Sequence, residues 1–204
     1  IVSVFTVVDS MKSQISSSIE ALGDDVLYIQ KWPWSFGEDY AWWEYMKRPI
    51  PTYKEAEAIA QNAENAEAVG YIVNTSANVS YRGNEIERAG LVLATQAFDR
   101  VRNIDIEDGR YFAEAESRGG KNVALIGFDA AIILFNNPYE AIGKSVRIKK
   151  YKFKVIGILE REGTSLLSGS NLDQAIVIPF TAASAFVDTK SKNLNSQIVV
   201  KAKQ

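Results

Sequence analysis

Apolar and polar positions follow two different rhythms along this chain, one helical and one extended. Near the N-terminus, apolar residues recur at intervals of three and four with serines on most of the opposite side, at Val8, Met11, Ile15, Ile19 and Leu22. This spacing predicts an amphipathic helix, which Gly23 is suited to end. The stretch "DVLYIQ" that follows alternates residue by residue, as expected of a strand.

A second helix begins after the prolines at positions 49 and 51. The stretch "TYKE" is a capping box, with Thr52 at the N-cap and the Glu55 side chain reaching back to it. The apolar side of this helix predicts a buried stripe made of Ala56, Ile59, Ala60 and Ala63.

The middle of the chain predicts a hairpin. Alternating segments run up to Tyr81 and from there to about Leu93, and Arg82-Gly83-Asn84 between them supplies the turn. The stretch "TQAFDRVRNI" then predicts a short helix, and "EDGRYF" a turn led by Asp108-Gly109.

The last third alternates strands with short helices. "NVALIG" is a continuous apolar strand, and "FDAAIILF" a helix that turns Ala130, Leu134 and Phe135 inward. "LDQAIVIP" is expected to be a strand, "FTAASAFVD" a short helix with Thr181 as a candidate cap, and "QIVVKAK" the final strand. The whole pattern predicts an α+β fold of mixed β-sheets with packed helices.

A strongly basic hairpin is predicted within "SVRIKKYKFKVIGIL", with its turn at Lys149-Lys150. One side carries Val146, Ile148, Phe153 and Val155, and the outward side carries Arg147, Lys149, Lys152 and Lys154. This basic side could contact acidic lipid or protein. The favoured interpretation is a solvated sheet edge that lysines guard against unwanted pairing.

All four tryptophans lie in one aromatic segment that also contains prolines and glycine. Its candidate contact residues are Trp32, Trp34, Phe36, Tyr40, Trp42 and Trp43. A loop whose aromatic side chains fill a small local core is the favoured interpretation. The alternative is a surface that contacts a partner, because Trp and Tyr are frequent at interface hot spots.

Composition excludes several kinds of chemistry. The chain has 204 residues, 47% of them hydrophobic, a net charge of −2 and a pI near 5.4, which argues against nucleic-acid binding. It contains neither cysteine nor histidine. Disulfides, thiolate metal sites, the Ser-His-Asp and Cys-His constellations and the usual zinc and non-haem iron sites are therefore absent. We expect no catalytic residue, cofactor or metal in this domain.

The sequence Gly143-Lys144-Ser145 resembles the end of a P-loop. The first glycine of that motif would fall on Pro138, which has no N–H to donate, and "SVRI" afterwards alternates like a strand. We interpret the stretch as a structural turn, in which Gly143 allows a special backbone angle and Lys144 faces solvent.

The chain opens with Ile1, and "IVSVFTVV" is far shorter than the roughly 20 residues that span a bilayer. It could be a surface strand, a turn of buried helix, or the outer end of a membrane helix.

Several motifs in the last third resemble a known family. The run "NVALIGFDAAIILFNNPYEAIGKSVRIKKYKFKVIGILEREG" and the later "LDQAIVIPFTAAS" are similar to the extracytoplasmic domain of MacB-type ABC transporter permeases, and more distantly to FtsX-like permeases. "SSSIEALGDDVLYIQ" and "DGRYF" add to the likeness. The matching positions include Gly127, Leu134, Phe135, Gly143, Lys144, Gly157, Asp173 and Pro179. Asn136 and Ala141 depart from the family pattern, and the tryptophan-rich segment matches nothing in it.

The resemblance implies two lobes. Residues 1–110 and 185–204 would form a porter-like α/β lobe, and residues 111–184 an inserted, smaller Sabre-like lobe. Residues 1–22 would be a helical stalk that continues a first membrane helix.

The resemblance also implies a role without chemistry. The domain would sit on the periplasmic side of the inner membrane, joined to it by flanking helices. It would transmit motion driven by a cytoplasmic ATPase, work beside a second permease copy, and engage a periplasmic adaptor to export substrate.

Two competing functions stay open. A sibling role in lipoprotein release, or in FtsX-like regulation of a cell-wall hydrolase, would use a similar domain with another partner. A soluble enzyme or ligand-binding domain would instead show a deep polar pocket with convergent carboxylates.

Overall fold

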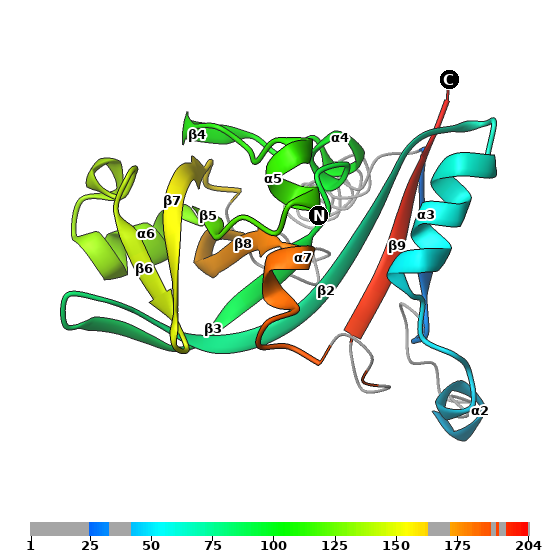
Figure 1. The fold of residues 1–204 in the computed structure, drawn as a ribbon, viewed down its shortest axis with the longest axis horizontal. Helices are drawn as coiled ribbons and strands as arrows, with labels where there is room; N and C mark the ends of the chain where they lie inside the picture. The colour runs from blue at the N-terminus through cyan, green and yellow to red at the C-terminus, as the bar shows by residue number, and fades with distance from the viewer. Residues whose placement is uncertain (1–24, 33–41, 163–171, 189–190, 192–194, 204) are drawn as a thin grey trace, which may run out of the picture.

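The computed structural model describes residues 25–32, 42–162, 172–188, 191 and 195–203. They form a nine-stranded mixed sheet with helices on both faces (Figure 1), which confirms the predicted α+β class. The strands are β1 Val26–Gln30, β2 Ala66–Tyr81, β3 Asn84–Ala94, β4 Ile106–Gly109, β5 Val123–Ile126, β6 Ser145–Ile148, β7 Tyr151–Leu159, β8 Ala175–Pro179 and β9 Asn195–Ala202. The α-helices are α2 Trp42–Met46, α3 Tyr53–Asn62, α4 Phe98–Arg102, α5 Glu114–Arg118, α6 Phe128–Phe135 and α7 Phe180–Ala183, with 3₁₀ turns η1 Pro138–Glu140 and η2 Leu172–Gln174.

The backbone pairing of six strands closes into a ring. Its order is β2, β3, β8, β5, β7, β6 and back to β2. Strands β9 and β1 extend the sheet from the first half of β2, and β4 extends it from the end of β7. The pairs β3–β8 and β5–β7 are parallel.

The 16-residue strand β2 is the longest element and crosses most of the molecule (Figure 1). Its first half, Ala66–Asn74, pairs with β9, and Val79 and Ser80 near its end pair with β6. The predicted hairpin to β3 is confirmed. Arg82 and Gly83 form the turn with φ of 45° and 98°, two positive angles that match the twist of the flanking strands.

Successive side chains of each strand point to opposite faces of the sheet, and they form two separate hydrophobic cores. The first core lies inside the ring and includes Val79, Phe153 and Ile178, with α3, α6 and α7 packed on it. The second core lies on the opposite face of the sheet and includes Val92 and Val199, with α4 packed on it. The predicted inward residues of the helix α6 and of the β6–β7 hairpin are all buried, namely Ala130, Leu134, Phe135, Val146, Ile148, Phe153 and Val155.

The predicted capping box of α3 is confirmed, but its predicted buried stripe is partly wrong. The Thr52 N–H donates to Glu55 Oε2 at 2.7 Å, and the Glu55 N–H donates to Thr52 Oγ1 at 3.4 Å. Ala56 is buried and Ile59 half-buried, whereas Ala60 and Ala63 are exposed. A cavity between α3 and α5 opens beside Ala60, so this residue lies at the cavity wall and not in the core.

Two further local predictions are wrong. Asp108 and Gly109 lie in β4, paired with Ile158 and Gly157 of β7, because non-local pairing outweighs their local preference for a turn. Thr181 does not cap α7; it lies inside the helix, which follows Pro179, and its hydroxyl donates to the Ser117 carbonyl oxygen.

The predicted basic sheet edge is also wrong for β6. Arg147 on β6 pairs with Ser80 of β2 on one side and with Lys152 of β7 on the other. Lys154 of β7 likewise lies between Ser145 and Val123. Closure of the ring thus removes the edge that these cations were expected to guard.

The predicted N-terminal helix from Val8 to Leu22 lies outside the described residues. The division into lobes at residues 111 and 184 stays a prediction. Strands from both predicted lobes contribute to the ring.

Candidate functional site

The apolar surface of the described residues is concentrated on β1 and α2. Among all described residues, eight large apolar side chains are exposed. Five of them lie on or next to β1 and α2: Leu27, Ile29, Trp32, Trp43 and Met46. Leu27 is 66% exposed and Trp43 is 56% exposed, although Leu and Trp side chains are usually largely buried. Exposed apolar patches of this kind are typical of interaction sites.

A groove of about 510 Å³ lies beside this surface, and we call it the apolar groove. It is formed by β1, residues 48–51, α3 and β9. Its lining is mostly apolar: Ile29, Pro49, Ile50, Pro51, Ala58, Ile59 and Ile198, with the polar Gln30, Lys31, Arg48 and Glu55. Four separate segments contribute to it, so no single stretch of sequence reveals it.

The predicted contact residues are only partly described. Trp32 and Trp43 are exposed, and Trp42 begins α2, but its side chain lies outside the described residues, as do Trp34, Phe36 and Tyr40. Lys31 lies over the ring of Trp32, 5.4 Å from its centroid. The assignment of this segment to partner contact stays a prediction.

Two positions that match the family motif, Gly127 and Asp173, make close contacts with the backbone. A Cβ on Gly127 would lie 2.1 Å from the Leu172 carbonyl oxygen, and the Gly127 N–H donates to the Ala175 carbonyl oxygen at 2.9 Å. Asp173 is buried, and its Oδ1 accepts a hydrogen bond from the Glu162 N–H at 2.9 Å. The Gly127 contacts join η2 and β8 to the start of α6, and the Asp173 hydrogen bond joins η2 to the segment after β7.

The Gly143 turn has the geometry that the sequence predicts. Gly143 has a φ of +80°, and Lys144 is exposed. The Gly143 N–H donates to the Val155 carbonyl oxygen and the Lys144 N–H to that of Ala141, so both groups are used within the fold. The chain continues into strand β6 and not into a helix.

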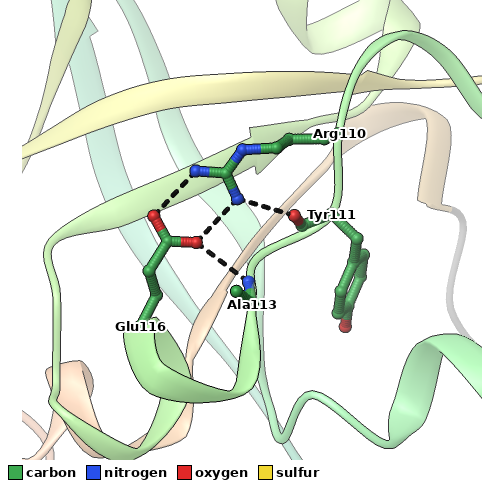
Figure 2. A network of polar contacts seen from close by, with 4 residues as sticks. All are labelled: Arg110, Tyr111, Ala113 and Glu116. Atoms are coloured by element: carbon green, nitrogen blue, oxygen red, sulfur yellow. Dashed lines mark hydrogen bonds and ion pairs between the residues drawn. The ribbon is translucent and has the colours of Figure 1, made fainter.

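The motif "DGRYF" connects β4 to α5 through a polar network (Figure 2). Arg110 donates from Nη1 to Glu116 Oε2 at 2.7 Å and from Nη2 to Glu116 Oε1 at 2.8 Å, and Nη1 also donates to the Tyr111 carbonyl oxygen. The Ala113 N–H donates to Glu116 Oε2 at 2.9 Å. These hydrogen bonds, above all those from Arg110, lower the pKa of Glu116 to about 2.

The neighbouring Tyr111 points the other way, into the second core. Its hydroxyl is buried and has no hydrogen-bond partner among the described residues. Burial raises the pKa of Tyr111 well above its usual value, and the nearby Asp99 carboxylate raises it further. The motif "DGRYF" does not by itself predict the Arg110–Glu116 pair, because the two residues are six positions apart and meet only through the start of α5.

A polar cavity of about 260 Å³ lies between α3, α4, α5 and the start of β2. Its charged lining residues are Glu57, Glu67, Arg100, Glu114 and Arg118. Arg118 pairs with Glu114 at 2.8 Å, and Glu67 pairs with Lys201 at 3.8 Å. Within the described ranges, no group of three acidic side chains is arranged to hold a metal ion. The carboxylates are thus partly neutralised by cations and do not converge on one point.

No helix in the described part of the chain has the length and apolar character needed to cross a bilayer. A family model for the MacB-like periplasmic core domain matches residues 1–204. The chain belongs to this family.

Similar full-length proteins are export permeases. This MacB-like core domain is 24% identical over 190 residues to the pyoverdine export ATP-binding/permease protein PvdT of Pseudomonas syringae pv. tomato. The matched region is 90% of this chain and 26% of that protein. The core domain is 31% identical over 133 residues to the macrolide export ATP-binding/permease protein MacB of Syntrophobacter fumaroxidans, covering 64% of the chain and 18% of that protein. The chain therefore spans about a quarter or less of these relatives.

Solved structures confirm the fold. The periplasmic region of MacB from Actinobacillus actinomycetemcomitans superimposes with a TM-score of 0.71 at 16% identity, covering 91% of this chain and 78% of that one. The extracellular domain of the noncanonic ABC-type transporter YknZ from Gram-positive bacteria gives a TM-score of 0.61 at 18% identity, covering 88% and 82%.

Proposed function

We propose that this MacB-like core domain is the extracytoplasmic part of an ABC exporter permease, and that it passes ATP-driven motion to a periplasmic partner. The observation that carries the proposal is the family match over the whole chain, together with relatives that are ATP-binding export permeases. Flanking helices would hold the domain at the periplasmic side of the inner membrane, beside a second permease copy. ATP hydrolysis would take place in a cytoplasmic domain or subunit, and the core domain itself would do no chemistry.

The shape of β2 supports a mechanical role. At about 3.3 Å per residue, its 16 residues have a contour length of about 50 Å along the curved strand. One end is hydrogen-bonded to β9 and the other to β6, so a displacement of β9 is carried along a covalent strand to the far side of the ring. Closed pairing and two packed cores make bending of this strand costly.

The exposed apolar surface around β1 and α2 supports partner engagement. It combines exposed large apolar side chains, such as Trp43 and Leu27, with the apolar groove, and this combination is typical of protein interfaces. We assign this surface to a periplasmic adaptor.

The motion can be tested with spin labels, because the chain has no native cysteine. Lys54 on α3 and Lys150 at the β6–β7 turn are exposed. In a full-length permease without other cysteines, a cysteine at either position would carry one spin label in each copy. Trapping the ATP-bound state should change the distance between the two copies at both positions. The distance between positions 54 and 150 within one copy should stay constant. Unchanged distances between copies would refute the coupling role.

The identity of the partner separates the proposed role from its sibling. Co-purification of the full-length permease with an adaptor protein supports export. Recovery of lipoproteins or of a cell-wall hydrolase in its place supports lipoprotein release or FtsX-like regulation.

A further inference from the structure

The β6–β7 hairpin concentrates positive charge in a chain that is slightly acidic overall. Residues 144–154 contain six of the 23 lysines and arginines and no acidic residue, while the whole chain has a net charge of −2. We call the outward side chains of Arg147, Lys152 and Lys154 the basic face. All three are exposed, and the opposite side of the same two strands is buried in the first core.

The basic face carries a like-charged pair that lowers stability. Arg147 lies directly opposite Lys152 in the antiparallel register, and Lys154 follows one row further along, opposite Ser145. Like charges at directly opposite positions destabilise a sheet. Protection of a sheet edge does not account for the arrangement either, since Arg147 and Lys154 have neighbouring strands on both sides.

The cations of the basic face are not neutralised by the domain itself. The ion pairs and hydrogen bonds of the described side chains involve none of the three. The acidic residue closest in register is Glu85, which pairs with Ser80, the neighbour of Arg147. Its carboxylate accepts a hydrogen bond from Asn78 Nδ2 at 3.0 Å.

The hairpin is held rigidly at its turn. The Tyr151 hydroxyl donates to the Ala185 carbonyl oxygen at 3.0 Å, and Lys149 Nζ donates to that of Phe186 at 3.2 Å. The rings of Tyr151 and Phe186 stack with their centroids 5.3 Å apart. The backbone positions of the basic face are thus fixed before any partner arrives, which lowers the entropic cost of binding.

We infer that the basic face is a docking surface for a carboxylate-rich protein surface, carried by the extracytoplasmic partner. The inference rests on the proposed function. A protein is favoured over anionic lipid because cations spaced by a fixed strand register match carboxylates at fixed positions, whereas mobile headgroups need no such spacing. The hairpin turn also lies on the opposite side of the molecule from the C-terminus (Figure 1).

Photo-crosslinking in the full-length permease tests this. A benzoylphenylalanine in place of Ser145 lies on the basic face and leaves its three cations intact. The expected adduct is a segment of another extracytoplasmic protein with Asp and Glu at the contact, identified by peptide mass spectrometry. Lys152→Glu combined with Arg147→Glu should lower the adduct yield about tenfold, since two attractive contacts become repulsive. Lys54→Glu, on α3, should leave it unchanged.

Stability measurements keep this test interpretable. Arg147→Gln with Lys152→Gln removes the like-charged pair, so the thermal unfolding temperature should stay level or rise while the adduct yield falls. An adduct to lipid, to a second copy of this chain or to a segment without acidic residues would overturn the inference, as would a yield that ignores the charge changes.

A second crosslinking position separates this inference from the proposed function. A benzoylphenylalanine in place of Trp43 reports on the apolar surface. A protein adduct there without one at Ser145 would overturn the inference and leave the proposed function standing. The absence of a protein adduct at both positions would overturn the inference and would also count against partner engagement as a whole.

Discussion

Replacing Glu116 by glutamine should remove a pH-dependent part of the stability of this domain. A pKa lowered from 4.5 to about 2 corresponds to about 3 kcal/mol between the two protonation states before screening. The Arg110 side chain is 54% exposed, and solvent screening reduces such a contribution to about 1 kcal/mol. Glu116→Gln should therefore lower the free energy of unfolding by about 1 kcal/mol at neutral pH.

The sign of the pH dependence follows from the lowered pKa. The folded state favours the Glu116 carboxylate, so its contribution is fully present above pH 4.5 and is lost as the pH falls towards 2. Denaturant unfolding followed by circular dichroism at a series of pH values should show the difference between the native chain and Glu116→Gln shrinking over this window. Glu114→Gln is a matched control: its partner Arg118 is 77% exposed, and the substitution should have almost no effect. A difference that is equal at every pH would refute the charge-based reasoning and assign the effect to the second acceptor oxygen facing Arg110, which the glutamine NH2 group cannot replace.

Substitutions at four other positions test the packing and capping described above. Thr52→Ala should lower the free energy of unfolding by about 1 kcal/mol through loss of the capping box, whereas Thr52→Ser should preserve most of it. Gly127→Ala should lower the free energy of unfolding by more than about 3 kcal/mol, because the new Cβ would overlap the Leu172 carbonyl oxygen. Gly143 has open space around it, so Gly143→Ala should lower the free energy of unfolding by only about 1 kcal/mol, through the positive φ. Equal losses in denaturant unfolding would contradict this. Tyr111→Phe removes a buried hydroxyl without a partner among the described residues and should raise the thermal unfolding temperature; a lower temperature would mean that the hydroxyl is satisfied after all.

Sequence patterns predict the elements of this fold well where the cause is local. The capping box at Thr52 and the turn at Arg82-Gly83 depend on residues within a few positions of each other. The alternation in the β6–β7 hairpin likewise determines which side of each strand is buried.

The wrong predictions all involve partners that are distant in sequence. Gly109 looks like a turn residue, yet its pairing with Gly157 places it in a strand. Thr181 looks like a helix cap, but its hydroxyl bonds to Ser117 on another helix. The missed apolar groove has the same origin, because its four segments meet only after the sheet has brought them together. The missed Arg110–Glu116 pair is local, and it forms where the chain turns into α5.

The closed ring of strands limits how this domain can be divided or recombined. Strands β2 and β3 come from the first half of the chain and β5 to β8 from the second, yet each needs the others to satisfy its backbone hydrogen bonds. Residues 111–184 separated from the rest of the chain would leave both pieces with unsatisfied strand borders, and such borders promote aggregation. A piece that keeps these borders paired would have to contain the β2–β3 hairpin together with residues 111–184.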